Sequence, residues 1–346
     1  MGYYLGVDIG SVNVKLALID ENSRVVQLDT KKVTSSPRAA VSSLIARLGE
    51  GFDLKEIIAA GVSGSGKGVI PKELGWTAYS SSLAIAAGLL HHYPDVKTVI
   101  QIGGQSTLVI ELEDGLRKPW KVESNPLCAA GTGRFLEQQA YRIGISMEDF
   151  ASLALKFKGT APRIAARCSV FAKTDLIHLQ QKGTPLDAML YALCESVARM
   201  VSSLKKGTFQ EPVYFVGGVA ANPAVAKSLN DMISARNGHP VEVTIPENYL
   251  HMESLGSALL SVGKTSRSVM LAEAEAKQRY FEMPRLEIVA STSRSKDGQR
   301  IEEPCVGYLG VDVGSTSTKA VIMDESGTRV LAKHCLLYTS RAHETV

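Results

Sequence analysis

The sequence contains a pattern of three short strands twice, and each time a glycine-containing turn follows the first strand. The first set reads LGVDIGS, VKLALID and RVVQLDTKKV, with tight turns expected at Gly10-Ser11 and Glu21-Asn22. The second set is predicted at 96–102, 106–112 and 116–122. Because helical patterns follow both sets, the sequence predicts an α/β protein with two similar lobes, mixed sheets and a cleft between the lobes.

Helices are expected after both sets of strands, and Ser35-Ser36 is a start signal for the first of them. The expected helices cover 37–48, 80–91, 133–143, 169–180, 185–204, 222–234 and 253–262. Two further strands are predicted at 57–62 and 213–216, each with a glycine-rich loop after it. The lobes should therefore each contain a mixed sheet with helices packed against it.

Composition excludes several classes of protein. The 346 residues carry a net charge of +3 and are 45% hydrophobic, so a mainly disordered chain is excluded. The small charge argues against a nucleic-acid binder, and no apolar run is long enough to predict a membrane span. The N-terminus has no export signal, so we expect a cytoplasmic protein. Five dispersed cysteines argue against a disulfide framework.

The beginning of the sequence recurs near its end. Tyr4–Glu21 reads YLGVDIGSVNVKLALIDE, and Tyr308–Glu325 reads YLGVDVGSTSTKAVIMDE. We predict a complete unit over 1–263, a linker over 264–307, and the start of a second unit over 308–334. So short a stretch is too small to form an ordinary domain of its own.

The last residues, 335–346, read CLLYTSRAHETV. With one permitted set of codons, CLLYTS back-translates to a sequence resembling a transposon-end sequencing adapter. We therefore hypothesise that this segment is translated adapter and that the gene was truncated there. The alternative is an ordinary C-terminal strand and loop, and the source nucleotides distinguish the two.

The first turn has the residues expected of a phosphate site. Asp8 lies near the end of a buried strand, where an acid is costly unless it faces a cleft, a metal or a donor. Gly10 allows backbone N–H groups to approach an anion, Ser11 adds a hydroxyl, and Lys15 can direct a cation back at the turn. Together these residues suit a magnesium-bound triphosphate, although such a turn can also be purely structural.

Two more glycine-rich turns follow in the order that a two-lobed phosphate clamp needs. The second contains Gln101, Gly103, Gly104 and Gln105, between two predicted strands. The third contains Gly217-Gly218, where a strand leads into a helix whose N-terminus favours anionic groups. Any one of these turns is weak evidence, but three in this order point to a nucleotide.

At this point the chain resembles the actin-like, sugar-kinase and Hsp70 ATPase superfamily, which has a ribonuclease H-like fold. Within it the chain resembles the BadF/BadG/BcrA/BcrD-type ATPases, the activators of 2-hydroxyacyl-CoA dehydratases and benzoyl-CoA reductases. The resemblance covers residues from about Tyr3 to Gly263. It rests on three strings, NPLCAAGTGRFL at 125–136, ARCSVFA at 166–172 and GGVA at 217–220. The repeat at Tyr308 is similar to longer members with two such units.

The resemblance implies a homodimer in which Cys128 and Cys168 of two copies hold one [4Fe–4S] cluster. It also implies ATP or ADP with Mg²⁺, a ferredoxin or flavodoxin as electron donor, and a dehydratase or reductase component as acceptor. One chain supplies two cysteines in suitable context and a cubane needs four thiolates, which agrees with a two-fold axis. Without these flanking strings, both cysteines would be read as buried structural residues. Cys194 has the helical spacing of a core residue.

The chain departs from the family at several acids. Gln101 and Ser106 are neutral where the family usually has acids, and SSSLAIAAG at 80–88 lacks the acid that the family places there. Asp8 is then the main acid that the sequence identifies for the cation or the attacking water. ATP binding is therefore expected more firmly than ATP hydrolysis.

Other functions remain open at this stage. A small-molecule kinase of the same superfamily would need neither cysteine, and a regulatory unit that binds nucleotide without hydrolysis would fit the missing acids. The string GVSGSGKG at 61–68 nearly matches a P-loop, but Gly68 follows the lysine and no clear helix begins there. We interpret it as a turn near the cleft.

Overall fold

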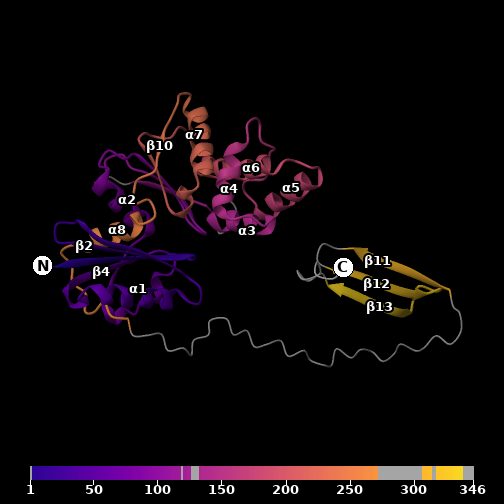
Figure 1. Cartoon of the computed structure of the whole chain (residues 1–346), viewed down its shortest axis with the longest axis horizontal. Helices are drawn as coiled ribbons and strands as arrows, with labels where there is room; N and C mark the ends of the chain where they lie inside the picture. Colours follow the sequence, from indigo (N-terminus) through magenta and orange to yellow (C-terminus); the bar gives the residue numbers. More distant parts are fainter. Residues whose placement is uncertain (1, 118–119, 126–131, 272–305, 314–316, 338–346) are drawn as a thin grey trace. The chain divides into compact units, whose positions relative to one another are not determined.

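The computed structural model describes residues 2–117, 120–125, 132–271, 306–313 and 317–337. The chain divides into two compact units, Met1–Tyr280 and Phe281–Val346. Figure 1 shows the eight labelled helices that belong to the first unit and the three-stranded sheet of the second. Within the described ranges, no helix is both long enough and apolar enough to cross a membrane.

The first unit contains two five-stranded mixed sheets with the same topology. The order in the first sheet is β3-β2-β1-β4-β5, with β1 Tyr3–Ile9, β2 Asn13–Asp20, β3 Val25–Lys32, β4 Ile57–Ser63 and β5 Thr77–Ala78. The order in the second is β8-β7-β6-β9-β10, with β6 Thr98–Ile102, β7 Thr107–Glu111, β8 Lys121–Ser124, β9 Val213–Val216 and β10 Val243–Thr244. In each, the first three strands pair antiparallel and the last two pair parallel. The predicted two-lobed α/β fold with mixed sheets is confirmed.

The helices follow most of the predicted ranges. They are α1 Pro37–Gly51, α2 Ser81–His92, α3 Gly133–Ile143, α4 Met147–Lys156, α5 Ser169–Gln181, α6 Leu186–Leu204, α7 Pro223–Asn237 and α8 Met252–Leu259. Ser36 begins α1 as predicted, because its side chain accepts a hydrogen bond from the Ala39 amide. Some elements differ from the prediction: α4 and the short strands β5 and β10 were not predicted, and β8 starts five residues later than the strand expected at 116–122.

Three hydrophobic clusters show how the layers of the first unit are stacked. The first cluster joins α1 to one face of the first sheet, for example Leu44 to Leu16. The second cluster places α2 and α8 between the two sheets, with Leu89 and Leu255 among strand residues of both lobes. The third joins the outer face of the second sheet to α3, α4, α6 and α7. The lobes therefore share an internal layer made of α2 and α8.

Helix α8 lies unusually close to its neighbours because glycines line the contacts. A β-carbon at Gly256 would lie 1.7 Å from the carbonyl oxygen of Ala84 in α2, and one at Gly6 in β1 would lie 1.9 Å from that of Ser254. Only glycine fits at such approaches. In Figure 1 the orange α8 lies among the indigo strands of the first lobe, although it is far from them in the sequence. This packing brings the start of α8 to the end of β1.

Residues 264–271 continue along the first lobe. The Ser266 amide donates to the carbonyl oxygen of Ile58, and Val269 is buried in the cluster of α1 and the first sheet. The division of the chain into a complete unit, a linker, a second start and a foreign tail stays a prediction.

The second unit contains one antiparallel sheet in the order β11-β12-β13. Its strands are β11 Gly307–Val313, β12 Ser317–Asp324 and β13 Val330–Leu337. Strand β13 includes Cys335, at the start of the segment that we hypothesise to be translated adapter, and 338–346 lie outside the described residues.

Candidate functional site

A cavity of about 690 Å³ lies in the first unit, and residues of both lobes line it. Its wall contains the first two predicted turns, the part of the third that follows Gly217, and the beginnings of α3 and α8. Predicted site residues that line it are Asp8, Gly10, Ser11, Lys15, Gln101, Gly103, Gly104, Gln105 and Gly218. The fold therefore brings together residues that are more than 200 positions apart in the sequence.

The first turn connects β1 to β2 and holds a buried ion pair. Asp8 and Lys15 face each other in the register of the two strands, and the Lys15 Nζ lies 2.7 Å from Asp8 Oδ2. Burial lowers the pKa of Lys15, but the charge of Asp8, their hydrogen bond and the charge of Glu253 outweigh it, so this pKa is raised. The Gly10 amide closes the turn by donating to the Asn13 carbonyl oxygen over 3.1 Å. Ser11 remains exposed beside the cavity.

The second turn connects β6 to β7 and is tied to α3. The Gly103 amide donates to the Ser106 carbonyl oxygen over 2.8 Å, which closes the turn. At the start of α3, the amides of Gly133 and Arg134 donate to the carbonyl oxygens of Gly103 and Gly104, each over 2.9 Å. The turn is therefore held rigidly, with Gln105 on the cavity side.

The third turn follows β9, and its two glycines, which the sequence analysis treated alike, have different surroundings. Gly218 lines the cavity, whereas Gly217 is not among its lining residues. Gly217 has φ of 94°, and a β-carbon there would lie 2.5 Å from the carbonyl oxygen of Ile102. Its requirement for glycine is thus explained by backbone conformation and close packing against β6. Asn222 caps α7 by accepting from the Ala224 and Val225 amides.

Glu253 is a site residue that the sequence reading did not identify. It lies in the first turn of α8, lines the cavity and is 9% exposed. Burial and the charge of Asp8 raise the pKa of Glu253 to about 7. Hydrogen bonds from Ser81 and Ser63 to the carboxylate, and the charge of Lys15, act in the opposite direction. The sequence did carry a weak signal, because this is the one acid in the otherwise small and apolar stretch MESLGSAL.

Three polar atoms of the cavity wall are buried and have no hydrogen-bond partner within the described part of the chain. They are Gln101 Oε1, Asn222 Nδ2 and Glu253 Oε1, one from each of three elements. Leaving a buried polar group unpaired costs about 1–3 kcal/mol, so native proteins usually pair such groups with protein, water or ligand. Their convergence on one cavity indicates a site that a polar ligand completes.

The loop that nearly matches a P-loop also borders this cavity. Gly64, Ser65 and Lys67 line it, as expected of a turn near the cleft. Lys67 begins a single 3₁₀ turn over Lys67–Val69 rather than an α-helix, and its ammonium donates to the Tyr79 carbonyl oxygen over 2.9 Å. A P-loop requires an α-helix directly after its lysine, so this segment is not one.

The two predicted cluster cysteines differ in what the structure describes of them. Cys168 is a half-buried free thiol at the N-cap of α5, next to the exposed side chains of Val170 and Phe171. Cys128 lies outside the described residues. Cys194 is fully buried in α6 and burial raises the pKa of its thiol, which confirms its assignment to the core. Over the described ranges, no three His, Cys, Asp or Glu side chains are grouped to hold a metal.

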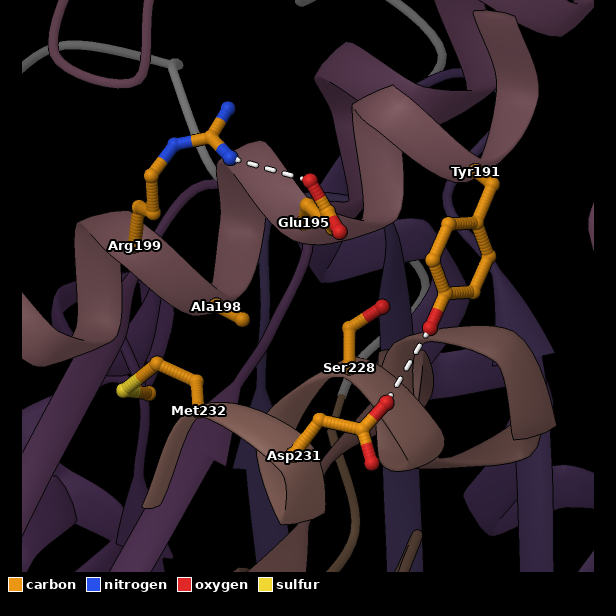
Figure 2. Close-up of a pocket in the computed structure, with 7 residues that line it drawn as sticks. All are labelled: Tyr191, Glu195, Ala198, Arg199, Ser228, Asp231 and Met232. Carbon is orange, nitrogen blue, oxygen red and sulfur yellow. Dashed lines mark hydrogen bonds and ion pairs between the residues drawn. The ribbon is translucent and has the colours of Figure 1, made fainter. Parts of the chain in front are cut away.

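A second and smaller cavity of about 270 Å³ lies between α6 and α7, as shown in Figure 2. Its polar side chains are already paired with each other: Arg199 bonds to Glu195, and the Tyr191 hydroxyl donates to Asp231, both over 3.2 Å. None of the residues predicted from the sequence to form a site lines it. The cavity between the lobes is therefore the candidate functional site.

Comparison with known proteins adds a family to this geometry. The profile of the BadF/BadG/BcrA/BcrD ATPase family matches residues 5–261, which include the whole cavity wall. Among curated relatives, the (R)-2-hydroxyglutaryl-CoA dehydratase activating ATPase of Acidaminococcus fermentans is 29% identical over 271 residues, which cover 77% of this chain and 99% of the relative. The activator of lactoyl-CoA dehydratase of Anaerotignum propionicum is 28% identical over 264 residues, which cover 74% of this chain and 96% of its own.

Solved structures agree with this comparison. The activator of the 2-hydroxyisocaproyl-CoA dehydratase from Clostridium difficile, solved with bound ADPNP, superposes with a TM-score of 0.67. The two are 27% identical, and the match covers 75% of this chain and 94% of that one. This relative binds an ATP analogue on a fold of the same architecture.

Proposed function

This chain belongs to the BadF/BadG/BcrA/BcrD ATPase family, and on that premise we propose that it is an ATP-dependent activator of a 2-hydroxyacyl-CoA dehydratase or a related reductase. In this function, nucleotide binding between the lobes is coupled to the transfer of a low-potential electron to the partner enzyme. The relatives named as dehydratase activators support the type of partner.

The observation that carries the proposal is the cavity in which three glycine-containing turns converge with an ion pair and unpaired polar atoms. In our assignment, Gly10 and Ser11 in one lobe and Gly103, Gly104 and Gln105 in the other bind the phosphates. Rigid turns that present backbone N–H groups favour anions. Gly218 and the capped start of α7 are assigned to the adenosine, with Gly217 supporting the turn from behind.

The remaining polar groups of the cavity are suited to Mg²⁺ and to hydrolysis. The carboxylate of Asp8 lines the cavity, and carboxylate oxygens are the ligands that Mg²⁺ prefers in proteins. Mg²⁺ would supply charge neutralisation at the phosphates. Lys15 holds Asp8 in place, and we assign Gln101 to orient the attacking water through its unpaired Oε1.

We extend the proposal to a [4Fe–4S] cluster held by Cys128 and Cys168 of two copies. The half-buried free thiol of Cys168 fits this use, because it lies at the N-cap of α5, where it is accessible to a ligand shared with a second copy. The exposed Val170 and Phe171 beside it would be covered in such a dimer. When bound, the cluster would supply a one-electron donor. The donor that reduces it is proposed to be a ferredoxin or flavodoxin.

Anaerobic purification tests the cluster. The wild type, reconstituted with iron and sulfide, is expected to contain about four of each per two chains. Cys128→Ser and Cys168→Ser should lose this iron, whereas Cys335→Ser, which changes an exposed thiol of the second unit, should keep it. An iron-free wild type after reconstitution would contradict the cluster assignment while leaving the nucleotide site in place.

ATP hydrolysis tests the nucleotide site and separates the alternative functions. Asp8→Asn is expected to lower the rate of hydrolysis at least about 100-fold. Nucleotide binding without hydrolysis by the wild type would favour a regulatory unit. Phosphate transfer to a small acceptor by an iron-free protein would favour a kinase.

A further inference from the structure

Two carboxylates share one ammonium at the floor of the cavity. Asp8 accepts a hydrogen bond from Lys15 over 2.7 Å, and Glu253 also interacts with the charge of Lys15. This group of three side chains has a charge of −1 when both acids are ionised. Elsewhere on the wall, Lys67 keeps its positive charge while it donates to a backbone carbonyl oxygen, and Arg134 pairs with Glu137.

Glu253 is placed as a ligand-facing group rather than as a packing residue. Glu253 lines the cavity, and its Oε1 is buried and has no hydrogen-bond partner in the described structure, although its backbone belongs to a regular helix packed by glycine contacts. Burying a carboxylate without a full set of partners is costly, and an alanine or glutamine would avoid that cost. An occupant that brings positive charge removes it.

Several positions where the family usually has an acid are neutral in this chain, so the site has few carboxylates besides Asp8 and Glu253. Gln101 and Ser106 replace acids that the family usually has, and 80–88 contains none. Ser81 is the first residue of α2 in that segment and lines the same cavity as Glu253. Because Gly256 has no side chain, α8 packs directly against the backbone of α2. At this short separation, a carboxylate on α8 reaches the N-terminus of α2.

We propose that Glu253 is the second carboxylate of this site and that, together with Asp8, it holds the divalent cation that accompanies the bound nucleotide. The cation balances the charge at the cavity floor and engages the unpaired Oε1. This inference rests on the proposed nucleotide site and specifies how a chain without the usual acids retains its cation.

Cation binding is measured directly with Mn²⁺ as a spectroscopic substitute for Mg²⁺. Electron paramagnetic resonance follows free Mn²⁺ in the presence of ADP and protein, and calorimetry gives the affinity for ADP with and without Mg²⁺. In Glu253→Gln, Mn²⁺ in the ADP complex is expected to bind at least about tenfold more weakly, since a carboxylate ligand becomes a neutral amide. Metal-free ADP should bind as well as to the wild type, or better.

Two further variants make the result specific. Glu247→Gln removes an exposed acid shortly before α8 and should leave Mn²⁺ binding unchanged. Ser81→Glu combined with Glu253→Gln returns a carboxylate from α2 and should restore most of the lost affinity. Thermal unfolding of each variant confirms folding, and Glu253→Gln should melt no lower than the wild type.

The outcomes separate this inference from the proposed function. If the wild type binds ADP with Mn²⁺ and Glu253→Gln binds both equally well, the role of Glu253 is overturned and the nucleotide site stands. If the wild type binds no nucleotide, both are overturned. Loss of Mn²⁺ affinity in Glu253→Gln, with ADP binding retained and rescue by Ser81→Glu, supports the inference.

Discussion

A similar two-strand sequence, Tyr4–Glu21 and Tyr308–Glu325, folds twice in this chain, in two different surroundings. In β1–β2, Asp8 pairs with Lys15, and in β11–β12, Asp312 pairs with Lys319 in the equivalent register. The first pair is 5% and 15% exposed with its atoms 2.7 Å apart, whereas the second is 68% and 56% exposed at 3.3 Å. Local sequence therefore sets the pairing of the strands. The ion pair becomes part of a site only in the first unit, where the surrounding elements bury it.

The apolar residues of the two sheets show the same contrast. Leu5 and Val7 of β1 are fully buried under α1, while Leu309 and Val311, their counterparts in β11, are each more than half exposed. Burial of an apolar side chain of this size contributes about 1.5–3 kcal/mol, so the first copy gains stability that the second lacks. Matched substitutions in the two units should therefore differ in their effects on stability.

The largest difference is expected from removing the lysine of each pair. Lys15→Met leaves Asp8 facing Glu253 without a cation and should lower the free energy of unfolding by about 3–5 kcal/mol. Lys319→Met breaks an exposed pair and should change it by less than about 0.5 kcal/mol. Urea unfolding is monitored in the first unit for Lys15→Met and in the second unit for Lys319→Met, and equal effects would contradict the role of burial.

The second difference concerns the matching glycines of β1 and β11. A β-carbon at Gly6 would overlap the α8 backbone, so Gly6→Ala should destabilise the first unit by about 2–3 kcal/mol. A β-carbon at Gly310 would lie 4.0 Å from the carbonyl oxygen of Val321, which is an ordinary contact, so Gly310→Ala should be close to neutral. Thermal unfolding of both variants is the measurement, and a tolerated Gly6→Ala would show that α8 can move away from β1.

The effect of pH on stability is expected to have opposite signs in the two units. The pKa of Glu253 is raised to about 7, so between about pH 4.5 and 7 the unfolded chain has lost a proton that the folded chain keeps. The free energy of unfolding therefore falls as pH rises through this window, by about 3 kcal/mol. Urea titrations at several pH values should show this slope in the wild type, and a weaker slope in Glu253→Gln.

In the second unit, Asp324 is exposed and has the opposite shift. A hydrogen bond from the backbone of Arg329 is the main cause that lowers the pKa of this carboxyl. Its contribution to the β12–β13 turn is thus present above the usual pKa of aspartate and is lost as pH falls through the lowered value. Amide exchange at Arg329 should accelerate in acid relative to the Asp324→Ala variant, whose exchange lacks this dependence.

The smallest expected difference is in how readily a reagent reaches the cysteines of the two units, and it does not involve stability. Cys194 is buried and its thiol pKa is raised, whereas Cys335 is exposed. A short treatment with iodoacetamide should modify Cys335 and spare Cys194 until the protein is denatured, because the reagent reaches the exposed thiol and not the buried one, whose raised pKa also disfavours the reactive thiolate. Peptide mass spectrometry reads both sites, and labelling of native Cys194 would contradict the burial of α6.

The sequence by itself predicted much of the architecture. Alternating apolar residues and turn glycines predicted the two sets of strands, and the Ser35-Ser36 start signal predicted the beginning of α1. These features are local, because each strand or helix end depends on residues a few positions away. The motif strings indicated the family, and Asp8, Lys15 and Gln101, which the sequence predicted as site residues, line the cavity between the lobes.

Tertiary structure decided what depends on contacts between distant segments. Glu253 carried only a weak local sign of function, and it became part of the site because Gly6 and Gly256 let α8 lie against β1 and α2. Gly217 looked like a ligand contact but serves the backbone beside Ile102. The two copies of the hairpin are alike in sequence and register, and their difference arises because burial, which sets charge interactions and pKa values, is a property of the surroundings and not of the strand.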